Sequence, residues 1–309
     1  MATQSPSLKR VEPLKLGAIK RRPRGWRALL SHHGFRRATQ VAFALFIVYT
    51  TVVHVAAGET STTVTASPEA FCPFGGIESI WSFVTSGGKT LPHTHLANVV
   101  LGGAFLLTAF FARAAFCGWV CPFGFLQEIF TGISRFAQKR SRAVRAAVRS
   151  IKTRGAALAA LDKPLRLLKY ALLVWSVTGA AYYGVMVFRD YDPWAALLTI
   201  VEMTFSFGLV VLIITLVASF FVERPWCRYA CPLGAIGGLV ARVGPVYLKR
   251  EGDACKGCAI CTKACPMGLN VHEAQTIKHP DCIGCLECVQ SCPRSGALEV
   301  KVGLPGMGR

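Results

Sequence analysis

Long uncharged apolar segments alternate with polar, strongly basic segments along this chain. Four apolar segments contain no Asp, Glu, Lys or Arg: residues 41–57, 96–112, 170–188 and 203–222. Each is close to the roughly 20 residues that an α-helix needs to cross a bilayer. Trp and Tyr residues near their ends are typical of a membrane interface. The pattern therefore predicts four transmembrane helices, with buried helices of a soluble core as the alternative.

The basic residues are distributed unevenly between these apolar segments. Residues 1–39, 113–169 and 223–309 contain ten, twelve and eleven Lys and Arg, whereas residues 58–95 and 189–202 contain one each. Basic loops stay on the cytoplasmic side of a membrane. We therefore expect a multi-pass protein of the bacterial inner (plasma) membrane, with both termini in the cytoplasm. Nucleic-acid binding is not expected, although the net charge is +19, because the basic residues are not gathered in one domain.

Eight of the 13 cysteines form two runs with the spacing C-x2-C-x2-C-x3-C-P. In tandem runs of this kind the first three thiolates hold one cubane and the fourth crosses to the other. We expect one [4Fe-4S] cluster on Cys255, Cys258, Cys261 and Cys292 and a second on Cys282, Cys285, Cys288 and Cys265. Structural zinc is disfavoured because its paired ligands are separated by a longer insert. Disulfides are disfavoured because they need an oxidising compartment.

Four further cysteines lie in a motif that occurs twice, each time after an apolar hairpin. A charged residue, Arg113 or Glu223, is followed by Cys-x3-Cys-Pro-x-Gly. This repeat indicates an internal duplication that brings Cys117, Cys121, Cys227 and Cys231 to the cytoplasmic membrane edge. Soft thiolates select iron-sulfur clusters, zinc or cuprous copper, so we expect an additional metal centre of open identity. Inert packing of small buried residues is the alternative.

A weaker repeat lies on the opposite side, where Phe71-Cys72-Pro73-Phe74 corresponds to Tyr191-Asp192-Pro193-Trp194. We expect Cys72 to be an unpaired packing residue. The candidates for a quinone site are ionisable groups at the ends of the apolar segments: His54, His93, His95, Asp190, Asp192 and Glu202. Axial haem ligation by His54 and His93 is a further alternative. No other catalytic residue is indicated.

These features define three parts: a basic cytoplasmic arm (1–39), a four-span membrane domain (40–222) and a cysteine-rich tail (223–309). The loop 113–169 is cytoplasmic and basic, and its residues 125–165 are expected to form amphipathic helices on the membrane surface. The predicted fold class is an all-α membrane domain of two duplicated hairpins, followed by a C-terminal α+β domain of the dicluster ferredoxin type.

The segments AFCGWVCPFG (115–124) and WCRYACPLGA (226–235), together with the tandem cysteine runs, resemble the polyferredoxin membrane proteins related to NapH, MauN, NosR and YccM. The resemblance extends from about residue 37 and implies an inner-membrane electron carrier. Members similar to NapH work as quinol dehydrogenase components. The loop 58–95 is short, so we expect no extended periplasmic flavin domain of the NosR type. Copper-reducing relatives share the Cys-x3-Cys-Pro motif, so the resemblance leaves the electron acceptor open.

We therefore expect electrons to pass among two [4Fe-4S] clusters, the Cys-x3-Cys-Pro centre and the quinone pool, with a redox partner protein as the other donor or acceptor. The alternatives are a copper or other metal reductase that assists assembly of a respiratory enzyme, and an iron-sulfur regulatory sensor without turnover.

Overall fold

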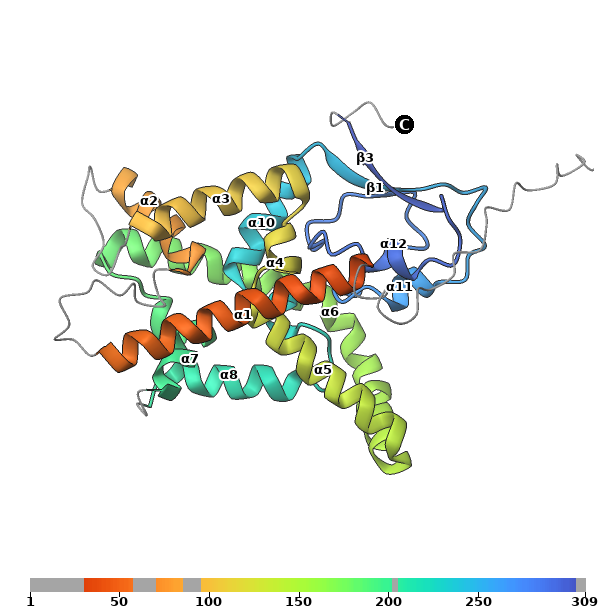
Figure 1. The fold of residues 1–309 in the computed structure, drawn as a ribbon, viewed down its shortest axis with the longest axis horizontal. Helices are drawn as coiled ribbons and strands as arrows, with labels where there is room; N and C mark the ends of the chain where they lie inside the picture. Colours follow the sequence, from red (N-terminus) through yellow and green to blue (C-terminus); the bar gives the residue numbers. More distant parts are fainter. Residues whose placement is uncertain (1–30, 58–70, 86–95, 202–204, 304–309) are drawn as a thin grey trace, which may run out of the picture.

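The structure is a computed structural model that describes residues 31–57, 71–85, 96–201 and 205–303. The described chain is mostly helical and ends in a small α+β region (Figure 1). The helices of the first part are α1 (His32–Ala57), α2 (Pro73–Thr85), α3 (Leu96–Ala112), α4 (Ala115–Trp119), α5 (Pro122–Arg140), α6 (Arg142–Tyr183), η3 (Arg189–Tyr191), α7 (Pro193–Val201), α8 (Phe207–Ala218), α9 (Pro225–Tyr229) and α10 (Pro232–Val243).

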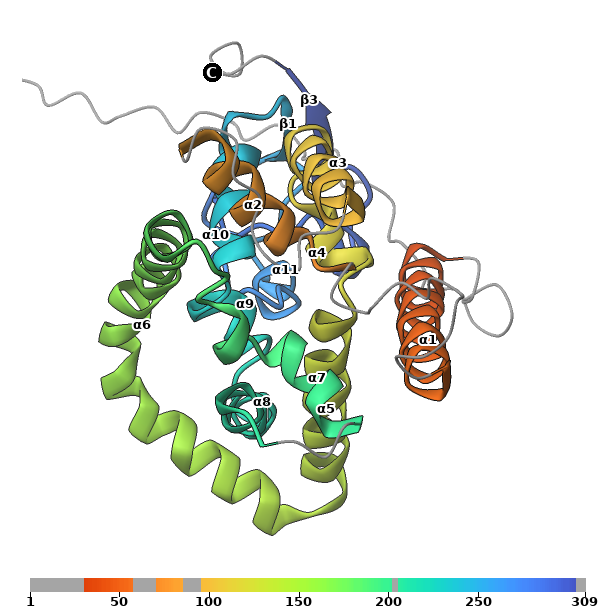
Figure 2. The same ribbon diagram turned by 90° about the vertical axis from the view of Figure 1, so that its left-hand side faces the viewer.

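The expected duplication is visible in the order of these helices. A short helix that starts with proline (α2 or α7) packs on an apolar helix (α3 or α8). A five-residue helix with the first motif cysteine follows (α4 or α9), and then another helix that starts with proline (α5 or α10). The long helix α6 connects the two copies and passes around the outside of the helical part (Figure 2).

The apolar segments differ in how well they coincide with helices. Segment 96–112 is α3, and segment 41–57 lies within α1, which begins earlier, at His32. Segment 170–188 is helical only to Tyr183, because Gly184 ends α6 in the left-handed region (φ 67°). Segment 203–222 contains the shorter α8, which the Ser206 hydroxyl caps by accepting a hydrogen bond from the Leu209 amide.

Within the described ranges no helix combines the length and the hydropathy that a membrane span requires. The one or two basic helices expected in residues 125–165 correspond to α5 and the first half of α6, which are separated at Ser141.

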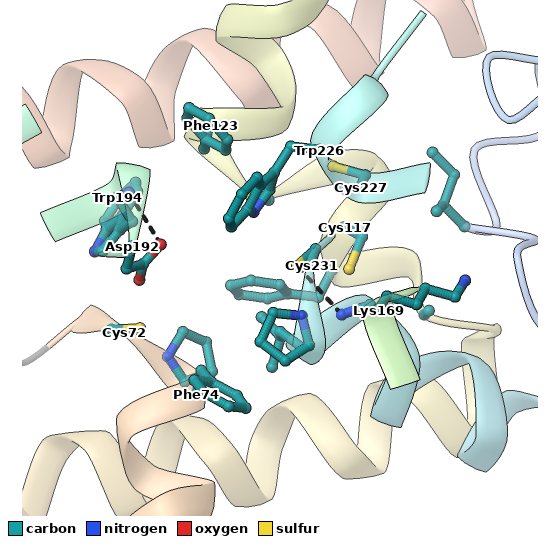
Figure 3. Close-up of a pocket in the computed structure, with 18 of the residues that line it drawn as sticks. Cys72, Phe74, Cys117, Phe123, Lys169, Asp192, Trp194, Trp226, Cys227 and Cys231 are labelled. Atoms are coloured by element: carbon teal, nitrogen blue, oxygen red, sulfur yellow. Dashed lines mark hydrogen bonds between the residues drawn. The ribbon is translucent and has the colours of Figure 1, made fainter. Parts of the chain in front are cut away.

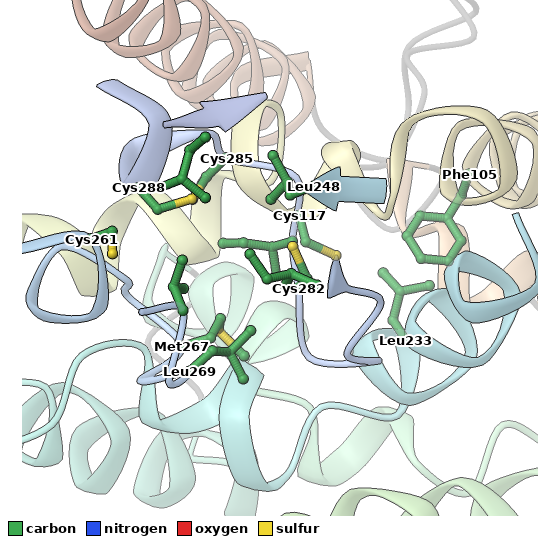
Figure 4. Packing of buried hydrophobic residues seen from close by; sticks show 14 of the residues in the cluster. Phe105, Cys117, Leu233, Leu248, Cys261, Met267, Leu269, Cys282, Cys285 and Cys288 are labelled. Carbon is green, nitrogen blue, oxygen red and sulfur yellow. The ribbon is translucent and has the colours of Figure 1, made fainter. Parts of the chain in front are cut away.

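The C-terminal region contains a three-stranded antiparallel sheet in the order β2-β1-β3. Its strands are β1 (Val246–Arg250), β2 (Thr276–Ile277) and β3 (Leu298–Val302), and two short helices, α11 (Ile260–Lys263) and α12 (Glu287–Ser291), complete it. The central strand pairs Leu248 with Ile277 on one side and with Val300 on the other. Figure 4 shows that Leu248 and Met267 belong to the same buried cluster as Phe105 and Leu233 of the helical part. The two parts therefore share one core.

Candidate iron-sulfur sites

The cysteines of the two C-terminal runs surround two cavities. One cavity is lined by Cys255, Cys258, Cys261 and Cys292, and the other by Cys265, Cys282, Cys285 and Cys288. These are the two groups that the crossing of the fourth cysteine requires. Cys258 is exposed, whereas the three cysteines of the second run in the other cavity are buried.

The backbone of each run repeats the same local conformation. Ala259 and Leu286 both precede a short helix, α11 or α12, in the left-handed region at φ 55°. Gly257 and Gly284 also have positive φ. At Gly284 a Cβ atom would lie 2.6 Å from the Ala112 carbonyl oxygen, so only glycine fits there. These turns aim the first three thiols of each run at one cavity.

The all-thiolate donor set of each cavity suits an iron-sulfur cluster. Among the described residues, no three His, Cys, Asp or Glu side chains are placed to share one metal ion. In a cubane each cysteine binds a different iron, so the ligands need only surround a cavity. Burial raises the pKa of Cys285 to about 12. Such a thiol loses its proton when it binds metal.

The four Cys-x3-Cys-Pro cysteines line one cavity together with Cys72 (Figure 3). The cavity has a volume of about 90 Å³, whereas a single water molecule requires about 10–15 Å³. Its lining includes the aromatic side chains Phe74, Phe123, Phe188, Trp194 and Trp226, together with the charged pair Lys169 and Asp281. The duplication therefore brings both cysteine pairs to one place, and Cys72, expected to be a packing residue, lies there too.

The Cys-Pro-x-Gly sequence has a local structural reason. Cys121 and Cys231 are the N-caps of α5 and α10, and each following proline occupies the first helical position, where a missing N–H costs nothing. The Sγ atom of Cys231 accepts a hydrogen bond from the Gly234 amide at 3.3 Å. Burial raises the pKa of Cys121 to about 11. Soft metal ions are the partners that convert such thiols to thiolates.

The first Cys-x3-Cys loop is in direct contact with the second ferredoxin run. The indole nitrogen of Trp119 donates a hydrogen bond to the Gly284 carbonyl at 3.1 Å. A Cβ atom on Gly118 would lie 2.5 Å from the Ile283 carbonyl oxygen and 3.4 Å from the Cys285 Cα atom. The two cysteine sites are therefore in direct contact through backbone atoms, because Gly118 has no side chain to separate them.

Buried arginines fix this contact. The Arg224 side chain is fully buried; its Nη1 donates to the Cys117 carbonyl at 2.6 Å and its Nε to Glu128 at 2.9 Å. Arg36 donates to the Gly118 carbonyl at 2.9 Å and also pairs with Glu128. Burial opposes ionisation of Glu128, but both arginines outweigh it and hold its pKa below the usual value.

Two further sets of contacts attach the C-terminal region to the helices. Arg36 forms an ion pair with Glu287 of α12 at 2.7 Å. On the other side, the nearly buried Asp281 carboxylate pairs with Lys169 and Arg166 of α6. Burial opposes ionisation of Asp281, but Lys169 and Arg166 hold its pKa below the usual value.

The structure separates the candidates for a quinone site. Asp192 lines the Cys-x3-Cys-Pro cavity, whereas Asp190 is exposed on η3. His54 lies in the last turn of α1 and is not among the residues that line the cavities above. His93, His95 and Glu202 lie outside the described residues.

Several residues of these sites carry no recognisable signal in the sequence: Arg36, Glu128, Arg224 and Asp281. The position of Arg224 directly after Glu223, the charged residue of the second motif, is the one signal that could have indicated its role. Nothing in the sequence connects Arg36 with Glu128, because 92 positions separate them.

Cysteine-lined cavities in a small α+β region define the class of protein: a ferredoxin-type iron-sulfur protein. Residues 94–141 and 204–250 match the family profile described as a 4Fe-4S binding domain, and residues 247–293 match the 4Fe-4S dicluster domain. The chain belongs to the family of 4Fe-4S ferredoxin-type proteins that includes NapH, YccM and NosR, and it is an iron-sulfur electron transport protein.

The similarity to individual proteins is moderate. YccM of Escherichia coli, named as an electron transport protein, is 29% identical over 80% of this chain and 70% of its own length. The ferredoxin-type protein NapH of Escherichia coli is 27% identical over 58% of both chains. The regulatory protein NosR of Pseudomonas aeruginosa is 28% identical over 55% of this chain and 21% of its own. No solved structure matches the chain.

Proposed function

We propose that the protein passes electrons between the quinone pool and a redox partner protein, as a quinol dehydrogenase component of the bacterial inner membrane. Two [4Fe-4S] clusters and a centre at the Cys-x3-Cys-Pro cysteines would supply one-electron transfer. The observation that supports this most directly is the backbone contact of Gly118 with Ile283 and Cys285, which joins two cysteine sites in one path.

The burial of the cysteines gives this path two distinct ends. Cys258 is the exposed cysteine among the 13, all of which the structure describes. A protein partner would therefore exchange electrons at the cavity of Cys255, Cys258, Cys261 and Cys292. The other end is the aromatic cavity of the Cys-x3-Cys-Pro motifs, where a small apolar molecule fits better than a protein surface.

The membrane location is supported by exposed apolar side chains and by charge. On α1 they include Leu45 and Val48, and on α8 Ile214 and Val217. Large apolar patches on a protein surface mark contact with lipid or with another protein. The basic residues of α5 and α6, such as Arg140 and Arg149, would then lie against anionic headgroups.

The experiment that tests the function compares the detergent-purified protein with a variant in which Cys117, Cys121, Cys227 and Cys231 are all serine. Iron, sulfide and copper are measured under anaerobic conditions, and EPR spectra are recorded before and after addition of a quinol. We expect more iron than two cubanes contain, falling to two cubanes in the variant, and quinol-dependent reduction in the unmodified protein.

Two results would contradict the proposal. Iron for two cubanes in both proteins, with copper lost only in the variant, would favour a metal reductase. Clusters that neither accept electrons from quinol nor deliver them to quinone would favour a sensor without turnover.

A further inference from the structure

The aromatic cavity continues into a second cavity that contains no cluster cysteine. Cys72, Phe74, Phe188, Asp192 and Trp194 line both cavities. We call the second one the carboxylate lobe, because Glu78 and Asp192 lie in its wall. Its two sides come from the weaker sequence repeat: Cys72-Pro73-Phe74 begins α2, and Asp192-Pro193-Trp194 begins α7.

Glu78 is an unusual buried acid. Its exposed fraction is 2%, and its Oε1 atom has no hydrogen-bond partner among the described residues. Asp192 accepts a hydrogen bond from the Trp194 amide at 3.1 Å. Arg189 supplies the positive charge in the lining of the lobe. A buried carboxyl oxygen without a hydrogen-bond partner is costly, so a role in binding or proton transfer accounts for its presence.

Both carboxyl groups titrate near neutral pH. Burial, together with the nearby Asp192, raises the pKa of Glu78 to about 8. Burial likewise raises the pKa of Asp192 to about 7. A general acid or base works best when its pKa lies near the working pH.

The adjoining aromatic walls suit a flat ring. Phe74 and Phe188 meet edge to face with centroids 5.5 Å apart, and the Phe188 centroid lies 6.2 Å from that of Trp226. The helices α2 and α7 begin at this place, so their dipoles favour a partly negative ligand oxygen. A ring with polar oxygens at its edge matches apolar walls that end in two protonatable acids.

We propose that the carboxylate lobe and the adjoining end of the aromatic cavity, where Figure 3 shows Cys72, Asp192 and Trp194, bind the head group of a quinone, with Glu78 and Asp192 as its proton carriers. The Cys-x3-Cys-Pro thiols at the other end of the cavity stay available for their own centre. Oxidation of one quinol to its quinone releases two electrons and two protons. The electrons pass one at a time to the iron-sulfur centres of the chain, and the two carboxylates accept the protons and release them to solvent. The inference rests on the proposed function and adds the place and the proton path.

Binding is tested first, with a fully substituted benzoquinone that bears a short alkyl tail, since its ring cannot add to thiols. The detergent-purified full chain is titrated with this quinone while tryptophan fluorescence is recorded. We expect saturable quenching that is largely lost when Trp194 and Trp226 are both changed to phenylalanine. Trp81→Phe, at an exposed site on α2, should leave the quenching unchanged. An azido derivative of the quinone should label peptides that contain Glu78 or Asp192.

Proton transfer is tested with the isosteric variants Glu78→Gln and Asp192→Asn. Quinone affinity should stay within about threefold, because an amide can still donate to a ring oxygen. The rate of cluster reduction by quinol should fall about 100-fold or more, the usual contribution of a general acid or base. Asp190→Asn, on the exposed neighbour, is the matched control and should leave the rate unchanged.

These experiments distinguish failure of the proposed quinone site from failure of the proposed function. Saturable quinone binding with the label elsewhere, or unchanged rates in both variants, would overturn the site and leave the proposed function intact. Absence of quinone binding and of quinol oxidation would overturn both. Copper bound by Cys72 in place of quinone would also overturn the site.

Discussion

Arg224 shows how one residue can serve two cysteine sites. It is buried beside Glu128 and the Cys117 carbonyl, and the Cys227, Cys121 and Cys285 thiols lie near enough to influence it electrostatically. A permanent positive charge there stabilises the more negative, reduced state of any centre that these thiols hold.

Arg224→Met should therefore shift the midpoint potentials of the adjacent centres to more negative values. It should also destabilise the protein by about 3–5 kcal/mol, because Glu128 loses one of its buried partners. EPR-monitored redox titration and thermal unfolding measure the two effects. Arg135→Met, which breaks the exposed pair with Glu223, is the control and should change stability by less than about 1 kcal/mol. Unchanged potentials would refute the electrostatic role.

Gly118 is required for the contact between the sites. In Gly118→Ala the added methyl group would collide with the Ile283 carbonyl oxygen at 2.5 Å. This oxygen belongs to the backbone, so it cannot move aside as the end of a flexible side chain could. We expect a loss of about 1–3 kcal/mol from overpacking and slower electron transfer between the second cluster and the Cys-x3-Cys-Pro centre. Stopped-flow reoxidation measures the rate. The same change at Gly132, where no atom lies within 4 Å, should leave the rate as it is.

For single residues, the sequence predicts the cysteine ligands of the clusters better than it predicts the residues that surround the sites. Cysteine spacing identifies which thiols share a cavity, because the ligands of a cubane are separated by only a few residues along the chain. Glu78 has no comparable signal, since its role depends on burial by Asn98 and Phe188 in a lobe that folding creates. The histidine candidates were chosen by their place at the ends of apolar segments, and the lobe instead uses carboxyl groups.

Among the elements, α5 connects two distant parts of the chain through one side chain. Glu128 on this helix pairs with Arg36 of α1 and with Arg224, the N-cap of α9. Because its pKa is lowered in the folded protein, Glu128 stabilises the fold above its unfolded pKa of about 4.3. This contribution is lost as pH falls through its lower folded pKa.

Glu128→Gln should remove this pH dependence and cost about 3–5 kcal/mol at pH 7. Thermal unfolding between pH 7 and pH 3, followed by tryptophan fluorescence, should show a smaller decline with acid in the variant than in the original protein. Glu251→Gln, in an exposed pair with Lys249, is the control and should follow the original curve. An equal acid decline in Glu128→Gln would show that other carboxylates dominate.

The sequence predicts the ends of a helix where the composition changes sharply. It does not predict them where a single capping residue or glycine ends the helix. Segment 96–112 coincides with α3 because proline and histidine precede it and Arg113 follows it. Segment 203–222 continues to look apolar past Ser219, but Ser206 and Ser219 cap a helix between them. Gly184 likewise ends α6 inside an apolar run. Hydropathy cannot register such local hydrogen bonds and backbone angles.

For the whole molecule, buried charges hold the C-terminal region against the helices. Asp281 connects it to α6, Glu287 connects it to α1, and Arg113 donates to the Val246 and His279 carbonyls. Buried pairs are screened little by salt. The two parts should therefore stay together at high ionic strength.

Asp281→Asn should weaken this attachment, because Lys169 and Arg166 would then lack a buried counter-charge. We expect cleavage between the helices and the ferredoxin-like region to become at least about tenfold faster in limited proteolysis, which corresponds to about 1.4 kcal/mol. Asp253→Asn, an exposed change in the same region, should not alter the cleavage rate. Equal rates for all three proteins would show that the shared apolar core alone holds the parts together.

The sequence predicted the duplication and the ferredoxin-like tail, because both leave repeated short motifs. It could not predict how the tail docks. That arrangement depends on Arg36, Lys169 and Asp281, each of which looks like an ordinary surface charge when the chain is read in order.

The two duplicated halves also differ at one pair of corresponding positions. Ala114 and Arg224 hold corresponding N-cap positions, both with left-handed backbone, but only Arg224 can reach across to the other copy. Gly124 is its complement, since a Cβ atom there would lie 3.0 Å from the Arg224 guanidinium. Two copies of either half alone could not reproduce this contact, because one half supplies the arginine and the other the space that receives it. Halves produced as separate polypeptides should therefore pair with each other rather than with themselves.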